Sequence, residues 1–176
     1  VTIALSARHD SNDVFASADT YRFEAVYQLD DSIRWRGAWG TAVKNPTFTE
    51  LYGIYSGFQS NPNLSPEKSD SWEIGFEKSL MSDALQVGVT LFKAELKNEI
   101  ETVYDCDADW NCVSSPINIS GMSRRQGVEL NSSLTVHDGL SLTAAYTYTD
   151  ATQDNVDEDR RAKHIGSLSE IGRAHV

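Results

Sequence analysis

The chain has 176 residues and a formal net charge of −11, and 40% of its residues are hydrophobic. This acidic balance argues against nucleic acid as a partner, because binding to phosphates depends on clustered Lys and Arg. Apolar runs fall short of the roughly 18 residues that a transmembrane helix needs. Composition therefore leaves both a soluble domain and a strand-built membrane barrel open.

Segments of alternating apolar and polar residues follow one another along the chain. In one of them, Trp72, Ile74 and Phe76 alternate with Glu or Gly. A period of two is typical of a β-strand, and no useful length of helical periodicity occurs. We expect about eight strands, at residues 2–8, 21–29, 33–43, 72–77, 85–91, 127–136, 140–149 and 164–169.

The connections between these segments alternate in length. Residues 30–32, 81–84 and 137–139 have the composition of tight turns. Between them lie long polar excursions at residues 9–19, 44–70, 101–121 and 150–161. Short turns at one end and long loops at the other are typical of bacterial outer-membrane barrels.

The two faces of the predicted strands differ in composition. On the apolar face, aromatic residues gather mainly near strand ends, as in interfacial girdles. These are Tyr21, Tyr27, Trp35, Trp39, Trp72, Tyr146 and Tyr148. The opposite face carries Arg22, Glu24, Arg34, Arg36, Glu73, Glu77 and Glu129. A dry core would not accept so many charges, so we predict that one face meets lipid and the other a polar interior.

Two positions depart from this pattern. Lys78 falls on the lipid face, one step from the short-turn end, where its ammonium can extend to the headgroups. At Leu91 and Phe92 two apolar residues are adjacent, which predicts either a bulge or a strand leaving the bilayer.

Both ends of the sequence have the character of truncations. It has no initiator Met and no signal peptide, so we expect it to begin inside a longer protein. Residues 170–176, EIGRAHV, correspond to a common sequencing-library adapter read in frame. We therefore expect a single domain at residues 1–169 and a tail without biological meaning at 170–176.

Four blocks of this sequence resemble TonB-dependent outer-membrane receptors, in particular the branch of cobalamin and catecholate siderophore receptors. The blocks are WGTAVKNPTFTELYG at 39–53, NPNLSPEKSDSWEIGFE at 61–77, RRQGVELNSSL at 124–134 and LSLTAAYTYTDA at 140–151. The resemblance implies an all-β fold, part of an antiparallel transmembrane barrel of about 22 strands filled by an N-terminal plug.

The same resemblance implies a function. The complete receptor would reside in the outer membrane of a Gram-negative bacterium and import cobalamin or an iron-siderophore with energy from TonB. The implied partners are outer-membrane lipid, lipopolysaccharide, the small-molecule ligand and the TonB complex. The plug, the TonB box and a C-terminal aromatic strand lie outside this sequence, so the expectation concerns the parent receptor.

Cys106 and Cys112 lie in the acidic segment YDCDADWNC, at residues 104–112. At an oxidising cell surface this spacing favours a disulfide, which contributes roughly 2 kcal/mol by closing a short loop. A cysteine pair can also bind metal, but no histidine or further cysteine nearby completes four ligands.

For ligand capture we expect Tyr52, Tyr55, Phe58 and Gln59, which lie in a Gly-flanked surface segment. Exposed aromatic rings can stack on a corrin, a catecholate or a sugar. Tyr104 and Trp110 are further candidates. The alternative is that these side chains pack within the loop itself.

The sequence gives no reason to expect catalysis, a cofactor or a metal. It has no Ser-His-Asp, His-Glu-x-x-His or Gly-rich phosphate motif, and its four histidines are scattered. The acidic segment 150–161 lacks the glycine and the spacing of a calcium loop. We interpret it as a solvated loop.

Two other classes of protein remain in competition. A passive porin shares the barrel physics but lacks a plug and energy coupling. A soluble β-sandwich binding module would need its charged faces in water and its aromatic faces against each other. The choice between corrin and siderophore stays open, because ligand specificity depends on loops and a plug largely outside this sequence.

Overall fold

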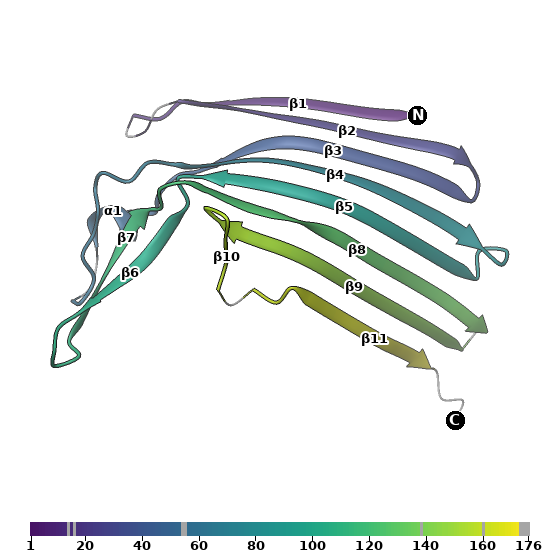
Figure 1. Ribbon diagram of the computed structural model, residues 1–176. Helices are drawn as coiled ribbons and strands as arrows, with labels where there is room; N and C mark the ends of the chain where they lie inside the picture. Colours follow the sequence, from purple (N-terminus) through teal and green to yellow (C-terminus); the bar gives the residue numbers. More distant parts are fainter. Residues whose placement is uncertain (14, 16, 54–55, 138, 160, 173–176) are drawn as a thin grey trace.

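The computed structural model describes residues 1–172 except 14, 16, 54, 55, 138 and 160. One curved antiparallel sheet dominates it, with the strand order β1-β2-β3-β4-β5-β8-β9-β11 (Figure 1). We call these strands the barrel wall. Their bounds are β1 Thr2–Asp10, β2 Ala18–Asp30, β3 Ile33–Lys44, β4 Glu67–Leu80, β5 Leu85–Lys97, β8 Met122–His137, β9 Leu140–Gln153 and β11 His164–Gly172.

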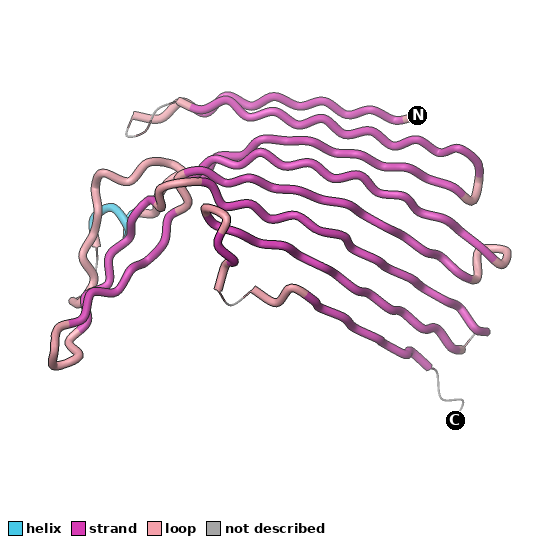
Figure 2. Tube along the Cα trace, in the orientation of Figure 1, coloured by secondary structure: helices cyan, strands magenta, loops and turns pink. Residues whose placement is uncertain are grey.

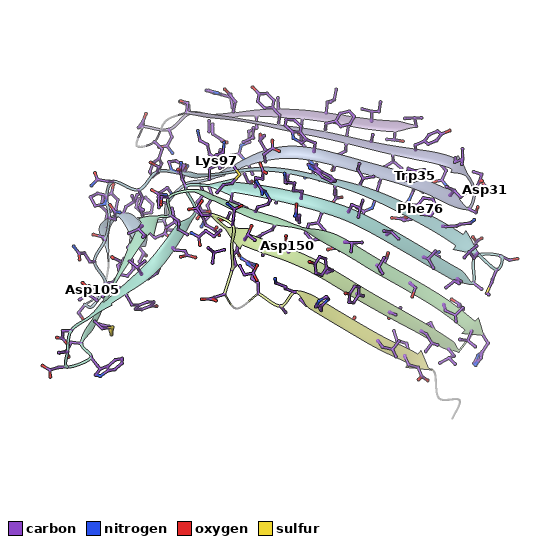
Figure 3. The ribbon with its side chains drawn as sticks, viewed as in Figure 1. Asp31, Trp35, Phe76, Lys97, Asp105 and Asp150 are labelled. Carbon is purple, nitrogen blue, oxygen red and sulfur yellow. A yellow bond between two sulfur atoms is a disulfide. The ribbon has the colours of Figure 1, made fainter. Side chains whose placement is uncertain are left out.

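Pairing between the strands places the apolar residues on one common face. Trp35 lies opposite Phe76, with ring centroids 4.7 Å apart, and Phe76 lies opposite Val89 (Figure 3). These side chains have no protein layer above them: Trp35 is 45% exposed and Ile74 is 51% exposed. Buried apolar side chains in the described part of the chain are Pro46, Leu51, Leu64, Pro116 and Ala151. So small a set cannot be the core of a soluble sandwich, so this face suits lipid.

The opposite face of the barrel wall carries a network of charges. The Arg36 guanidinium donates to Glu73 at 2.8 Å and to the Thr90 hydroxyl at 2.8 Å, and it lies 3.4 Å from Glu77. Arg34 also binds Glu77. Because Arg34, Arg36, Glu73 and Glu77 have partners of opposite sign, this face can line a polar interior.

The turns and loops segregate to opposite ends of the sheet, as predicted (Figure 2). At the short-turn end, the Asp30 carboxylate accepts hydrogen bonds from the backbone N–H groups of Ser32 and Ile33, at 2.7 and 2.9 Å. This side-chain cap fixes the turn between β2 and β3. The remaining elements all follow strands at the long-loop end.

Those remaining elements are α1 Phe48–Tyr52, β6 Ile100–Cys106, β7 Cys112–Asn118 and β10 Val156–Asp157. All of them lie in segments that the sequence predicts to be long loops. Among the described residues, no helix has the length and apolar character needed to cross a membrane.

The strands are longer than their alternating segments. β4 begins at Glu67 rather than at Trp72, and β5 continues to Lys97. Beyond the apolar zone polar residues occupy both faces of a strand, so the strand continues while its apolar alternation ends. The predicted strand boundaries are therefore too narrow at the long-loop end.

The predicted bulge at Leu91 and Phe92 is wrong, because β5 pairs without interruption with both neighbours. Phe92 lies on the interior face, opposite Gly127. A Cβ atom at Gly127 would lie only 2.9 Å from the Phe92 ring, so glycine leaves room for it. The alternative prediction, a strand that leaves the bilayer at this point, fits the structure, because charged residues follow Leu91 on the outer face of β5. Register shifts occur instead at Gln28/Asp30 and at Thr135/His137.

Candidate functional site

Two segments far apart in sequence combine beyond the long-loop end of the barrel wall. The backbone N–H of Gln59 donates to the Ser114 carbonyl at 2.8 Å, and the N–H of Ser114 donates to the Gly57 carbonyl at 3.0 Å. The Asn118 side chain accepts from the Ser65 N–H at 2.7 Å and donates to the Ser65 carbonyl at 2.9 Å. We call residues 45–66 and 98–121 together the loop assembly.

Local sequence signals explain how the first segment folds. Thr47 caps α1, with its hydroxyl accepting from the N–H of Glu50 while the Glu50 carboxylate accepts from the N–H of Thr47. This reciprocal capping box begins the helix. Gly53, at φ 64°, ends it in a conformation that favours glycine. The Leu51 side chain of the helix is buried, which anchors α1 within the loop assembly.

The loop assembly brings together three of the predicted ligand-binding residues. Phe58 forms a parallel bridge with Ser114, which is also the cross-strand partner of Tyr104. Gln59 is bonded to the same Ser114 through its backbone. Gln59 and Tyr104 are exposed, and Tyr104 is 73% exposed. Phe58 and Tyr104 therefore lie on the two sides of Ser114, and Gln59 follows Phe58 in the chain; we call these three residues the aromatic patch.

The other predicted residues lie elsewhere. Tyr52 is in α1, where its ring stacks on Phe48 at a centroid distance of 6.2 Å, and it remains 60% exposed. Trp110 is 85% exposed at the far tip of the β6–β7 hairpin. Tyr55 lies outside the described residues.

The hairpin tip is acidic and internally bonded. Cys106 and Cys112 form a disulfide across it. The Asp107 carboxylate accepts from the side-chain amide of Asn111 and from the N–H groups of Asn111 and Asp109, each at 2.9 Å. These hydrogen bonds, first that from the Asn111 side chain, lower the pKa of Asp107. The hairpin extends away from the barrel wall, with Asp105 near its tip (Figure 3).

An ion cluster anchors the loops to the barrel wall. Arg125 of β8 binds Glu99 at 2.7 Å and Glu158 at 3.2 Å, and Arg161 also binds Glu158. Burial alone would raise the pKa of Glu99, but hydrogen bonds from Ser123 and Arg125 outweigh it and lower that pKa. The cluster joins the loop before β6 to the loop after β10.

Sequence reasoning missed the roles of Ser114, Asn118 and Arg125, although these residues build the site. Each is polar within a polar segment, and its role follows only from a partner more than 20 residues away. On the interior face near the short turns, a polar groove of about 580 Å³ includes Arg34, Glu77 and Asn131. In the described part of the chain, no three His, Cys, Asp or Glu side chains converge on one metal-sized position.

Comparison with known proteins gives the same architecture. The siderophore receptor PirA from Pseudomonas aeruginosa superposes with a TM-score of 0.73 at 22% identity, over 86% of this chain and 31% of that chain. The ferric-catecholate import receptor Fiu from E. coli K12 gives 0.63 at 20% identity, over 91% and 23%. The copper transporter OprC gives 0.64 at 18% identity, over 79% and 21%.

These structural likenesses describe the fold, and this chain spans less than a third of each of the three structures. The family assignment comes from the sequence itself. Residues 1–172 match the TonB dependent receptor-like β-barrel family, which covers every strand of the barrel wall. The chain therefore belongs to the family of TonB-dependent receptor β-barrels.

Proposed function

We propose that this chain is part of a receptor that binds an iron-siderophore and imports it with TonB-coupled energy. As a member of its family the chain is an outer-membrane protein of a Gram-negative bacterium. The observation that carries the proposal is the loop assembly, which presents exposed aromatic side chains at the long-loop end of a lipid-facing wall.

In this proposal the aromatic patch makes the first contact with the ligand. The exposed ring of Tyr104 offers a flat face for stacking on a catecholate or another planar group. The exposed Gln59 side chain of the same patch can donate and accept hydrogen bonds. Because backbone hydrogen bonds through Ser114 hold these residues in place, little ordering is required when the ligand binds.

Support for a siderophore comes from the compared proteins, among which PirA and Fiu are described as siderophore and ferric-catecholate receptors. That the ligand is cobalamin stays a prediction that rests on the sequence resemblance alone. OprC, a copper transporter, shares the same fold, so the fold does not select the ligand. A plug, the TonB complex, lipid and lipopolysaccharide are the partners that the proposal requires.

Uptake of a radiolabelled ferric siderophore by cells under iron limitation tests this proposal. The complete receptor that contains this chain should support uptake that stops when the proton-motive force is dissipated. Energy-independent uptake that follows the external concentration would instead identify a passive porin. No uptake of any ferric siderophore, with cobalamin taken up, would assign the other ligand.

The aromatic patch is tested in the same assay. Tyr104→Ala should lower ligand affinity about tenfold, the equivalent of one lost stacking contact of roughly 1.4 kcal/mol. Val156→Ala is a suitable control, since Val156 is a 69% exposed side chain at the same end but outside the loop assembly. Equal affinities of the two variants would remove Tyr104 from the binding site.

A further inference from the structure

The loop assembly contains no Lys, Arg or His. In residues 45–66 the charged residue is Glu50, and residues 98–121 contain Glu99, Glu101, Asp105, Asp107 and Asp109. The other two long loops, residues 9–19 and 150–161, also hold more carboxylates than Lys and Arg. These four segments together account for the net negative charge of the chain, so that charge is concentrated at the long-loop end.

Three carboxylates of the β6–β7 hairpin have no counter-charge. Glu101, Asp105 and Asp109 are exposed, and none of them forms an ion pair within the described residues. Asp105 follows Tyr104 in β6, and Figure 3 shows Asp105 on the part of the hairpin that extends away from the barrel wall. The hairpin that carries Tyr104 of the aromatic patch therefore also carries uncompensated negative charge.

Basic side chains around the loops are already bound to carboxylates. Arg125 of β8 binds Glu99 at 2.7 Å and Glu158 at 3.2 Å. The other Lys and Arg ion pairs of the described residues at this end are Arg8–Asp10, Arg22–Glu24, Lys44–Glu67, Lys93–Glu95, Arg124–Glu95, Arg161–Glu158 and Lys163–Asp157. Lys68 and Lys97 form none in the described part of the chain, but each is an even number of residues from the lipid-facing residues of its own strand. An anionic ligand above the interior would therefore meet no unpaired Lys or Arg among the described residues.

Ferric siderophores differ in charge according to the groups that hold the iron. A catecholate binds the ferric ion through two negatively charged oxygens, so a complex with three catecholates is strongly anionic. A hydroxamate brings a single negative charge, so three of them neutralise the ferric ion and any further charge comes from the rest of the molecule. A surface of unpaired carboxylates repels an anionic complex and slows its approach, whereas an exposed aromatic ring attracts a cation.

We propose that the siderophore bound at the aromatic patch is an uncharged or positively charged ferric complex of the hydroxamate class, and not an anionic tris-catecholate. The apolar spacers between hydroxamate groups can pack on the exposed ring of Tyr104. A protonated amine of such a ligand can form a cation–π contact with the same ring or an ion pair with Asp105. The inference rests on the proposed function, because it specifies the class of siderophore that the receptor binds.

Binding of three ferric complexes to the complete receptor in detergent, measured by isothermal titration calorimetry, tests this inference. The probes are ferrioxamine B, a trihydroxamate whose free amine makes it cationic, its N-acetylated form, which is neutral, and ferric enterobactin, a tris-catecholate. At low ionic strength the cationic form should bind about fivefold more tightly than the neutral form, and added salt should remove this preference. Ferric enterobactin should bind more weakly than both. Equal or tighter binding of ferric enterobactin would overturn the inference.

A charge-neutralised variant shows whether the carboxylates of the hairpin cause the preference. Glu101→Gln/Asp105→Asn/Asp109→Asn should bind the cationic and the neutral form with equal affinity. Its affinity for the neutral form should match that of wild type, which also shows that the variant is folded. Asp83→Asn is the matched control, because it removes an exposed carboxylate from the turn between β4 and β5 at the opposite end and should keep the preference. An unchanged preference in the triple variant would overturn the inference.

Uptake by cells separates this inference from the proposed function. Energy-dependent uptake of an anionic ferric complex, with no uptake of a hydroxamate, would uphold the proposed function and overturn the inference. If cells import a ferric siderophore other than the three probes, its charge decides in the same way, and an uncharged or cationic complex supports the inference. A receptor that imports no ferric siderophore would overturn the proposed function and the inference together.

Discussion

The barrel wall and the loop assembly are held together in different ways. In the barrel wall, β3 and β4 pair without interruption from Ile33 and Lys78 to Lys44 and Glu67. The loop assembly depends instead on a few contacts to Ser114 and Asn118, a disulfide and one ion cluster. The loss of one contact by substitution should therefore matter little among the many contacts of the wall, but it should matter more in the loop assembly. In the wall we expect large effects only where a substitution places a charge against lipid or adds atoms where the neighbouring strand is already close.

The largest expected loss of stability comes from placing a charge on the lipid-facing side of the wall. Leu130→Arg should destabilise the folded barrel by about 2–4 kcal/mol, because it places a charge against lipid in the middle of β8. Asn131→Arg, its neighbour on the polar interior face, should be nearly neutral. Urea titration of the complete receptor in lipid vesicles measures both. Equal losses would contradict the assignment of the two faces.

Close packing inside the wall gives the second effect. Gly127→Ala should cost about 1–3 kcal/mol, since its Cβ would lie 1.9 Å from the Tyr148 carbonyl oxygen and backbone would have to move. Gly37→Ala is the control, because its nearest neighbour, the Glu73 carbonyl oxygen, is 3.8 Å away. The same titration should show a loss for Gly127→Ala alone. A tolerated Gly127→Ala would mean that the two strands are less closely packed there.

The junction between the wall and the loops gives the third effect. Arg125→Gln leaves Glu99 and Glu158 without their shared partner and should loosen the attached loops locally by about 1–3 kcal/mol. Hydrogen exchange of residues 156–159, read by mass spectrometry, should speed up while that of the wall stays unchanged. Arg124→Gln is the control, since the ion pair that Arg124 forms with Glu95 within the described residues is more exposed and its loss should have little effect.

The smallest effect is a dependence on pH at the hairpin tip. The pKa of Asp107 is lowered by its hydrogen bonds, so the tip should keep its full order at any pH above the ordinary aspartate range. As pH falls through the lowered pKa, the carboxylate takes up a proton and the tip should loosen. Amide exchange of Asp109 and Asn111 between pH 6 and pH 3, corrected for intrinsic rates, measures this change. In Asp107→Asn the same amides should exchange with no such pH dependence.

The sequence predicted the wall better than the loop assembly, for a physical reason. Alternation such as that of Trp72, Ile74 and Phe76 exists because lipid and a polar interior lie on opposite sides of a strand. Where polar side chains occupy both faces, as at the start of β4, that signal ends although the strand continues. Phe92 misled the prediction because an interior glycine, Gly127, leaves room for an aromatic ring on the polar face.

The aromatic patch shows a different limit of sequence reasoning. Exposed aromatic residues such as Tyr104 could be selected from composition alone, because they lie in a polar segment. Which of them share a surface depends on Ser114, whose sequence neighbourhood gives no hint of a contact with Gly57 and Gln59. Long-range contacts made through backbone groups leave no signature in side-chain pattern, so the patch could not be assembled from the sequence.

The contact through Ser114 also limits how such a receptor can acquire a new specificity. Residues 57–59 and β7 complete each other's hydrogen bonds, so replacing one segment alone would leave backbone N–H and carbonyl groups without partners. A loop exchange between receptors would therefore work best when both segments of the loop assembly move together. Although they are separated by β4 and β5 in the chain, the two loops form one unit of recombination.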